Sequence, residues 1–166
     1  MFGHKNHQDS PADGHRTEHQ AVRQYRYLLC TAPADALEAA HAQALPRLSD
    51  ADRAQLLDTV RDVLMAGTRL APSDIGAISH LMTVGGRRDP RGMAAAYPTG
   101  PLHALAAGVI STEAAFGLFS GYAGWDGTDP VGLADEPVDV DFERPGRSGE
   151  ERYSIARGMA EGGFSA

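Results

Sequence analysis

The residues best suited to chemistry in this chain are four histidines near its N-terminus: His4, His7, His15 and His19. His15 and His19 are four positions apart, so they share one face of a helix if a helix begins early. Neutral imidazoles at such separations can bind a divalent transition metal such as zinc, nickel or copper. Two interpretations stay open: an arm that captures metal weakly, and a solvated polar arm whose histidines bind nothing specific.

Enzymatic and structural zinc sites have patterns that this arm lacks. A zincin motif places glutamate directly after its first histidine, whereas Glu18 precedes the second histidine of the pair here. A structural zinc site usually has four ligands, often thiolates, and Cys30 is the single cysteine of the chain. The arm therefore does not predict a metalloprotease.

The other candidate catalytic groups are isolated in the sequence. His41, His80 and His103 are single histidines on predicted helices, and we expect each to be partly exposed rather than a catalytic base. Cys30 follows two leucines, which favours inert burial. The chain contains no Gly-x-Ser-x-Gly elbow, no dinucleotide-binding glycine motif and no Gly-Lys pair of a phosphate-binding loop. We therefore expect no enzymatic activity and no organic cofactor.

Charge is distributed unevenly along the chain. Of the net charge of −7, residues 126–166 contribute −6, from ten acidic and four basic side chains. Without a basic excess, binding to nucleic acid is not expected. The one local basic cluster is Arg87, Arg88 and Arg91. It is either a polar loop between helices or a site for an anionic surface, a phosphate or an acidic partner, and the acidic residues after 125 could fold back onto it.

The elements that must position these groups are helices. Helical spacing of apolar residues, with capping and breaking signals at the ends, predicts helices near 17–31, 33–45, 49–64, 73–84, 90–97 and 101–122. Residues 33–65 are predicted to form an antiparallel hairpin, and Gly85-Gly86 to end the helix before them. We expect an all-α bundle of four to five helices over residues 17–122, between a flexible arm (1–16) and an acidic, Gly- and Pro-rich, mostly extended or disordered tail (123–166).

The predicted helix over residues 101–122 is apolar on nearly every side, so it needs a cover. Three covers stay open: the core of the chain itself, a protein partner or second copy, and a membrane surface contacted through residues 101–125. The spacing Gly117-x-x-x-Gly121 would allow two helices to approach closely. The predicted interface residues are Leu105, Val109, Phe116, Gly117, Phe119 and Gly121.

The order of segments also carries a resemblance. The stretch LLCTAPADALEAAHAQALPRLSDADRAQLLDTVRDVL, the Arg-Arg-Asp-Pro-Arg-Gly element and the Gly/Ala-rich helix resemble small actinobacterial proteins that often carry the name "cation-transporting ATPase", over residues 25–122. The resemblance implies a helical protein that is cytoplasmic or peripheral to a membrane. A P-type pump needs an Asp-Lys-Thr-Gly-Thr sequence, and the only lysine here is Lys5, so ATPase activity is not expected.

Together these patterns predict a non-enzymatic helical interaction module. It would self-associate or dock a protein partner through the helix over 101–122. The alternatives are a metal-binding protein that uses the histidine-rich arm, and a membrane-peripheral protein. The single cysteine and the absence of a signal-peptide pattern favour a cytoplasmic location.

Overall fold

The computed structural model describes residues 18–129, which form helices joined by turns. Along the chain these are α1 (Gln20–Thr31), α2 (Ala34–Ala44), η1 (Leu45–Arg47), α3 (Asp50–Leu64), α4 (Ile75–Arg88), α5 (Pro90–Ala96), α6 (Thr99–Ile110) and η2 (Tyr122–Gly124), where η marks a short 3₁₀ turn. The described residues contain no strand, so the predicted all-α class is confirmed, with six α-helices where four to five were expected.

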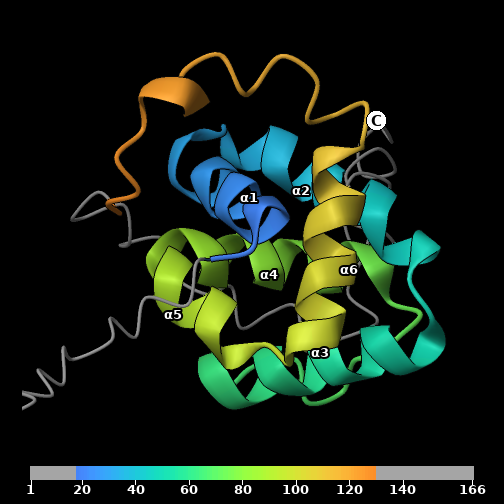
Figure 1. Cartoon of the computed structure of the whole chain (residues 1–166). Helices are drawn as coiled ribbons and strands as arrows, with labels where there is room; N and C mark the ends of the chain where they lie inside the picture. Colours follow the sequence, from blue (N-terminus) through green and yellow to red (C-terminus); the bar gives the residue numbers. More distant parts are fainter. Residues whose placement is uncertain (1–17, 130–166) are drawn as a thin grey trace, which may run out of the picture.

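The helices α4 and α6 each contact α1, α2 and α3, and α6 lies in front of α4 in the view of Figure 1. α1 and α2 pack against one side of them, α3 packs against the other, and α5 contacts α1 and α4. The hairpin predicted over residues 33–65 is therefore wrong. Both of its helices form, but η1 turns the chain between them, and each buries its apolar stripe against α4 and α6 instead of against the other.

Two helix starts follow their sequence signals. The Ser49 hydroxyl accepts a hydrogen bond from the Asp52 amide at 3.1 Å and donates one to the Asp52 carboxylate at 2.7 Å. The Asp89 carboxylate accepts from the Gly92 amide at 2.8 Å, and Pro90 is the first residue of α5. These bonds satisfy amides that have no partner inside a helix, so Ser49 and Asp89 are the N-caps of α3 and α5.

Gly85-Gly86 was expected to end a helix, and this expectation is wrong because α4 continues to Arg88. A Cβ at Gly86 would lie 2.6 Å from Leu29 Cδ2 of α1, and one at Gly85 would lie 3.2 Å from Leu64 of α3. The two glycines let α4 lie close to its neighbours. Glycine is needed at both positions because of tertiary packing, which local helix propensity does not reveal.

The long apolar helix predicted over residues 101–122 is also wrong. α6 ends at Ile110, and residues 111–121 form a series of turns. The Thr112 hydroxyl donates to the Val109 carbonyl at 2.7 Å and accepts from the Ala115 amide at 3.2 Å, so this side chain competes with the helical bonds. Gly117 has a φ of +82°, which no helix contains.

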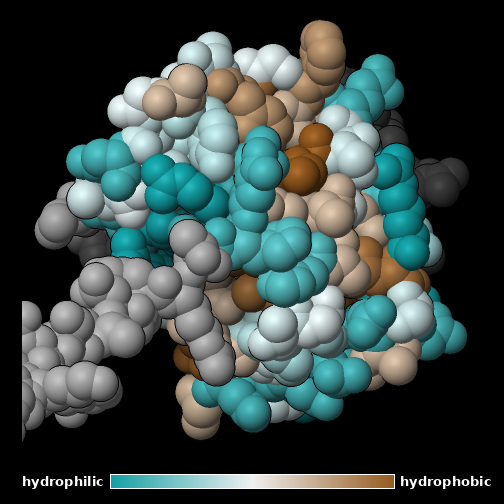
Figure 2. Space-filling view, viewed as in Figure 1, coloured by the Kyte–Doolittle hydropathy of each residue, from teal (hydrophilic) through white to brown (hydrophobic). Residues whose placement is uncertain are grey.

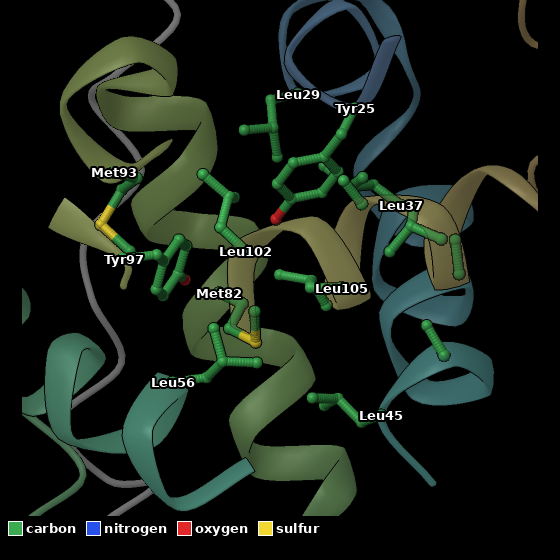
Figure 3. Close-up of a cluster of buried hydrophobic side chains, with 14 of the residues drawn as sticks. Tyr25, Leu29, Leu37, Leu45, Leu56, Met82, Met93, Tyr97, Leu102 and Leu105 are labelled. Atoms are coloured by element: carbon green, nitrogen blue, oxygen red, sulfur yellow. The ribbon is translucent and has the colours of Figure 1, made fainter. Parts of the chain in front are cut away.

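Large apolar side chains from all six helices meet in the core (Figure 3). At most 7% of the surface of any of them is exposed: Tyr25, Leu29, Leu37, Leu56, Met82, Met93, Leu102 and Leu105. Burying one such side chain contributes about 1.5–3 kcal/mol. The core thus holds together helices that are far apart in the sequence, such as α1 and α6.

The ends of the described chain add two details to the predicted helices. The first helix begins at Gln20 rather than near Thr17, with His19 as its N-cap. At the other end, Trp125 and Gly127 lie against α1, within the segment predicted as an extended tail. The predicted arm (1–16) and the rest of the predicted tail (130–166) lie outside the described residues.

Candidate functional site

Arg26 of α1 is a buried arginine, with 4% of its side chain exposed. Its guanidinium binds the Glu18 carboxylate through two bonds of 2.9 Å and the Asp129 carboxylate through one of 2.6 Å. The hydrogen bonds that Arg26 donates to Glu18 raise the pKa of Arg26 above its ordinary value, although burial lowers it, and Asp129 adds to the rise. We call Glu18, Arg26 and Asp129 the Arg26 clasp. It joins the two ends of the described chain.

Residues 125–129, which we call the strap, lie along α1 and reach α5. The Trp125 carbonyl accepts a hydrogen bond from Arg23 at 3.0 Å. The Gly127 carbonyl accepts two, from Arg26 at 2.9 Å and from Arg91 of α5 at 3.0 Å. The guanidinium carbons of Arg23 and Arg26 also lie 5.0 and 4.9 Å from the centre of the Trp125 ring, at cation–π distance. Three arginines therefore hold the strap.

The strap also has hydrogen bonds of its own. The Asp126 carboxylate accepts from the Thr128 hydroxyl at 2.7 Å and from the Thr128 amide at 2.9 Å, which lowers the pKa of Asp126. The Trp125 indole N–H donates to the Thr128 carbonyl at 3.0 Å. Gly127 has a φ of +86°, and a Cβ there would lie 2.6 Å from Arg23 Nη1. The turn thus requires glycine at this position.

Cys30 lies beside the clasp, with its sulfur 3.7 Å from Asp129 Oδ1. Burial raises the pKa of the Cys30 thiol to about 12, and the charge of Asp129 contributes to the rise. Because the thiolate is the reactive form, this sulfur is a poor nucleophile near neutral pH. The side chain is buried, as its leucine-rich context predicts.

A second polar group lies inside the core, where Tyr25, His41 and Thr83 connect α1, α2 and α4. His41 Nε2 lies 2.9 Å from the Tyr25 hydroxyl, and Nδ1 lies 2.9 Å from the Thr83 hydroxyl. The Thr83 hydroxyl donates to the Ser79 carbonyl at 2.8 Å, so it accepts from Nδ1–H, and Nε2 accepts from Tyr25. We call these three side chains the interior relay.

The interior relay is closed to solvent. His41 is completely buried, which corrects the expectation that it is partly exposed. Burial lowers the pKa of His41 to about 3, so the ring is neutral at physiological pH. Tyr97 lies in the same core with a buried hydroxyl that has no hydrogen-bond partner among the described residues. The relay can position helices, and within residues 18–129 the imidazole has no exposed surface.

The predicted metal ligands are only partly described by the structure. His19 caps α1, with its Nδ1 accepting from the Ala21 amide at 3.3 Å. Its ring stacks on that of His103 of α6, with 4.2 Å between the ring centres. His4, His7 and His15 lie outside the described residues. Between residues 18 and 129, no three His, Cys, Asp or Glu side chains are grouped to hold a metal ion.

The predicted arginine cluster is divided between two contacts. Arg87 donates to the Ala32 carbonyl at 2.7 Å, whereas Arg91 contacts the strap. Arg88 is exposed at the end of α4. One acidic residue after 125 lies against the cluster, since Asp129 Oδ2 is 3.8 Å from Arg91 Nε.

The predicted interface residues are separated by burial. Leu105 and Val109 have no exposed surface and belong to the core. The Phe119 ring stacks on Tyr27 at 6.3 Å. Phe116, in contrast, is 89% exposed. Apolar side chains gather over α6 and over the chain that follows it, whereas α3 is mainly hydrophilic (Figure 2).

The two interface glycines have roles other than the predicted one. Gly117 supplies the left-handed turn after Phe116, and a Cβ at Gly121 would lie 2.6 Å from the Tyr27 hydroxyl. Because neither glycine lies on an α-helix, the Gly117-x-x-x-Gly121 spacing is not a helix-packing motif in this fold.

A shallow hollow of about 360 Å³ lies between α2 and α4. Asp35, Glu38 and Ser79 contribute its polar lining. The Ser79 hydroxyl donates to the Ile75 carbonyl at 2.7 Å, and His80 contacts Glu38 at 3.0 Å. The serine is engaged within its own helix, so the hollow presents no paired nucleophile and base.

Sequence reasoning did not identify the clasp, the strap or His103 as a partner of His19. One available signal was the position of Arg26. Val22, Arg26 and Leu29 are spaced by four and three residues, which places the arginine on the buried stripe of α1. A charged residue at such a position requires a partner. The spacing does not reveal that this partner is Asp129.

Comparison with protein-family models, with curated proteins and with solved structures finds no match to this chain. The resemblance drawn over residues 25–122 therefore stays a prediction. Among residues 18–129, no helix has both the length and the hydropathy needed to cross a bilayer.

Proposed function

We propose that this chain is a non-enzymatic helical binding module that docks a protein partner through residues 111–121, with Phe116 as its anchor. The observation that carries the proposal is the exposure of Phe116, at 89%, within a segment whose other large apolar side chains are at least partly buried. An exposed aromatic ring among half-buried neighbours such as Leu118 is typical of the central residues of protein interfaces.

The segment that carries Phe116 is held in one shape. The Thr112 hydroxyl forms hydrogen bonds with the backbone of Val109 and of Ala115. The Ala114 amide donates to the Gln43 side chain at 3.3 Å, and the Phe119 ring stacks on Tyr27. An anchor on such a segment loses little conformational entropy when it enters a partner's pocket. This rigidity supports docking of a preformed surface.

The test compares three full-length chains: wild type, Phe116→Ser and Met65→Ser. For each chain, light scattering gives the mass in solution, and a pull-down gives the proteins that the immobilised chain retains. Met65 is the matched control, because it is 84% exposed but lies at the end of α3. A second copy of the chain is the first partner to test, by light scattering. We expect Phe116→Ser to abolish an association that Met65→Ser preserves. Equal behaviour of all three chains, in mass and in retained proteins, would contradict the proposal.

Metal binding is a second candidate, favoured by the stacking of His19 on His103. The stack adds the imidazole of His103 to the four near the N-terminus: His4, His7, His15 and His19. Calorimetry with zinc and with nickel on the full chain tests it. We expect His103→Ala to weaken binding as much as His19→Ala does, and His80→Ala, which removes the contact to Glu38, to leave it unchanged. An absence of binding to the wild-type chain would exclude this function.

A further inference from the structure

We infer that the surface beneath the strap is a recognition site for an acidic peptide that carries a tryptophan, adopts the turn of the strap and is presented by a partner protein. The surface is formed by Arg23, Arg26 and Tyr27 of α1 and by Arg91 of α5. We call it the strap site. In the free chain the strap itself occupies it. This surface is separate from Phe116, so the inference does not depend on the proposed function.

Part of the recognition is independent of sequence. Arg23 donates to the Trp125 carbonyl, and Arg26 and Arg91 both donate to the Gly127 carbonyl. Any peptide that adopts the same turn presents its carbonyl oxygens in this way. The three guanidinium groups therefore form a set of donors that a peptide from another protein can also satisfy.

The remaining contacts select a particular peptide. The ring of Trp125 lies beneath two guanidinium groups and 5.4 Å from the centre of the Tyr27 ring. Four residues later, Asp129 binds Arg26. The glycine between them is required by its positive φ and by its contact with Arg23. The site therefore selects the pattern Trp-x-Gly-x-Asp, and both the ring and the carboxylate complement the positive charge of the surface.

The occupant can be exchanged without unfolding the domain. If the strap leaves, Arg26 keeps the two bonds to Glu18, so its buried charge still has a carboxylate partner. The donors that faced Asp129 and Gly127 then bind water or another acceptor, because an unsatisfied polar group in a partly buried position is costly. An acidic peptide supplies these acceptors. The part of the strap site formed by Arg91 is accessible to an incoming peptide, since the Arg91 side chain is 67% exposed.

The experiment measures binding of a dye-labelled synthetic peptide with the sequence of residues 122–131 to full-length chains. In two receptors the strap is disabled: Trp125→Ala/Asp129→Ala, and Gly127→Val, whose side chain would collide with Arg23. Circular dichroism verifies that each receptor keeps its helices. We expect saturable binding to both. We expect the wild-type chain to bind at least about tenfold more weakly, because its own strap competes at a high effective concentration.

Matched controls test the chemistry of the site. A peptide with asparagine in place of its last aspartate, and one with alanine in place of its tryptophan, should each bind several-fold more weakly to the open receptors. Adding Arg91→Glu to a receptor should lower affinity by at least about fivefold, and added salt should lower it further. The inference is overturned if neither folded receptor binds the peptide, if the altered peptides bind equally well, or if the wild-type chain binds as tightly as the open receptors.

Discussion

The interior relay and the Arg26 clasp are two polar groups that tie the same helix, α1, to distant parts of the chain. The relay joins Tyr25 to His41 and Thr83, and every member is buried and neutral. The clasp joins Arg26 to carboxylates that are 32% and 18% exposed, and all three groups are charged. Both satisfy their hydrogen bonds, but only the clasp has partners that can reach water.

Because of this difference in burial, the interior relay has a structural role, whereas the partners of the Arg26 clasp can be replaced by other groups. Breaking the relay leaves donors and acceptors in a dry core, where no other group can replace the lost partner. Breaking the clasp leaves charges that water or another carboxylate can satisfy. The relay therefore fixes the relative positions of α1, α2 and α4, and the clasp is the place where a ligand can compete.

The largest expected effect comes from His41→Ala. The substitution removes the middle of the relay, leaves the hydroxyl groups of Tyr25 and Thr83 without their partner and opens a cavity in the core. We expect the free energy of unfolding to fall by about 3 kcal/mol or more, measured by urea denaturation. His80→Ala is the control, and its cost should stay below about 1 kcal/mol, because this histidine lies at the surface of α4. A similar cost for both variants would show that the relay stabilises the core no more than a histidine at the surface does.

Acid should destabilise the domain through the relay. The pKa of His41 is about 3 in the folded chain, below its ordinary value of 6.5, so the unfolded chain binds the extra proton between these values. Stability is therefore present above pH 6.5 and is lost as the pH falls toward 3, at about 1.4 kcal/mol per pH unit from this group. His41→Gln should lose this part of the slope, measured by urea denaturation across the same pH range. An unchanged slope would mean that the imidazole is not buried as a neutral group.

Arg26→Ala tests the clasp and should cost less, about 1–2 kcal/mol, because Glu18 and Asp129 regain water when the guanidinium is removed. Its more specific effect is on the strap. Trp125 is the only tryptophan of the chain, and it loses a guanidinium from its ring face, so its fluorescence should shift toward that of a solvated indole. Loss of stability without this shift would contradict the role of Arg26 in holding the strap.

The smallest effect is expected from Tyr97→Phe. The Tyr97 hydroxyl is buried without a partner, so its removal should leave the free energy of unfolding unchanged within about 0.5 kcal/mol or raise it. Tyr25→Phe is the matched control, because its hydroxyl donates within the relay, and it should cost about 1–2 kcal/mol. Equal costs in the thermal or urea unfolding of the two variants would show that Tyr97 has a partner.

Local signals predicted the helices, and tertiary contacts decided how they end and pair. Ser49 and Asp89 cap helices through bonds to amides three residues away, so their roles are visible in the sequence. Gly86 continues α4 because Leu29, far away in the chain, leaves no room for a side chain. The apolar pattern continues to residue 122, but the helix does not follow it. The hydrogen bond of Thr112 and the positive φ of Gly117 produce turns instead, and hydrophobicity does not encode either feature.

The candidate site was less predictable for the same reason. Helical spacing places Arg26 on the buried face of α1, but the residues that satisfy it are eight positions before and 103 positions after it. Composition described the segment after 122 as an acidic extension. It did not show that Trp125 and Asp129 would meet arginines on α1, since that contact depends on the path of the chain after α6.

The Arg26 clasp has a mechanical consequence. Glu18 and Asp129 bind one guanidinium, so the chain enters and leaves the helical domain at the same point. Tension applied through the two ends would therefore pull first on the clasp, and the core would bear load only after these ion pairs had opened. The same proximity lets the domain be inserted into a loop of another protein, or its ends be joined by a short linker, without separating α1 from α6.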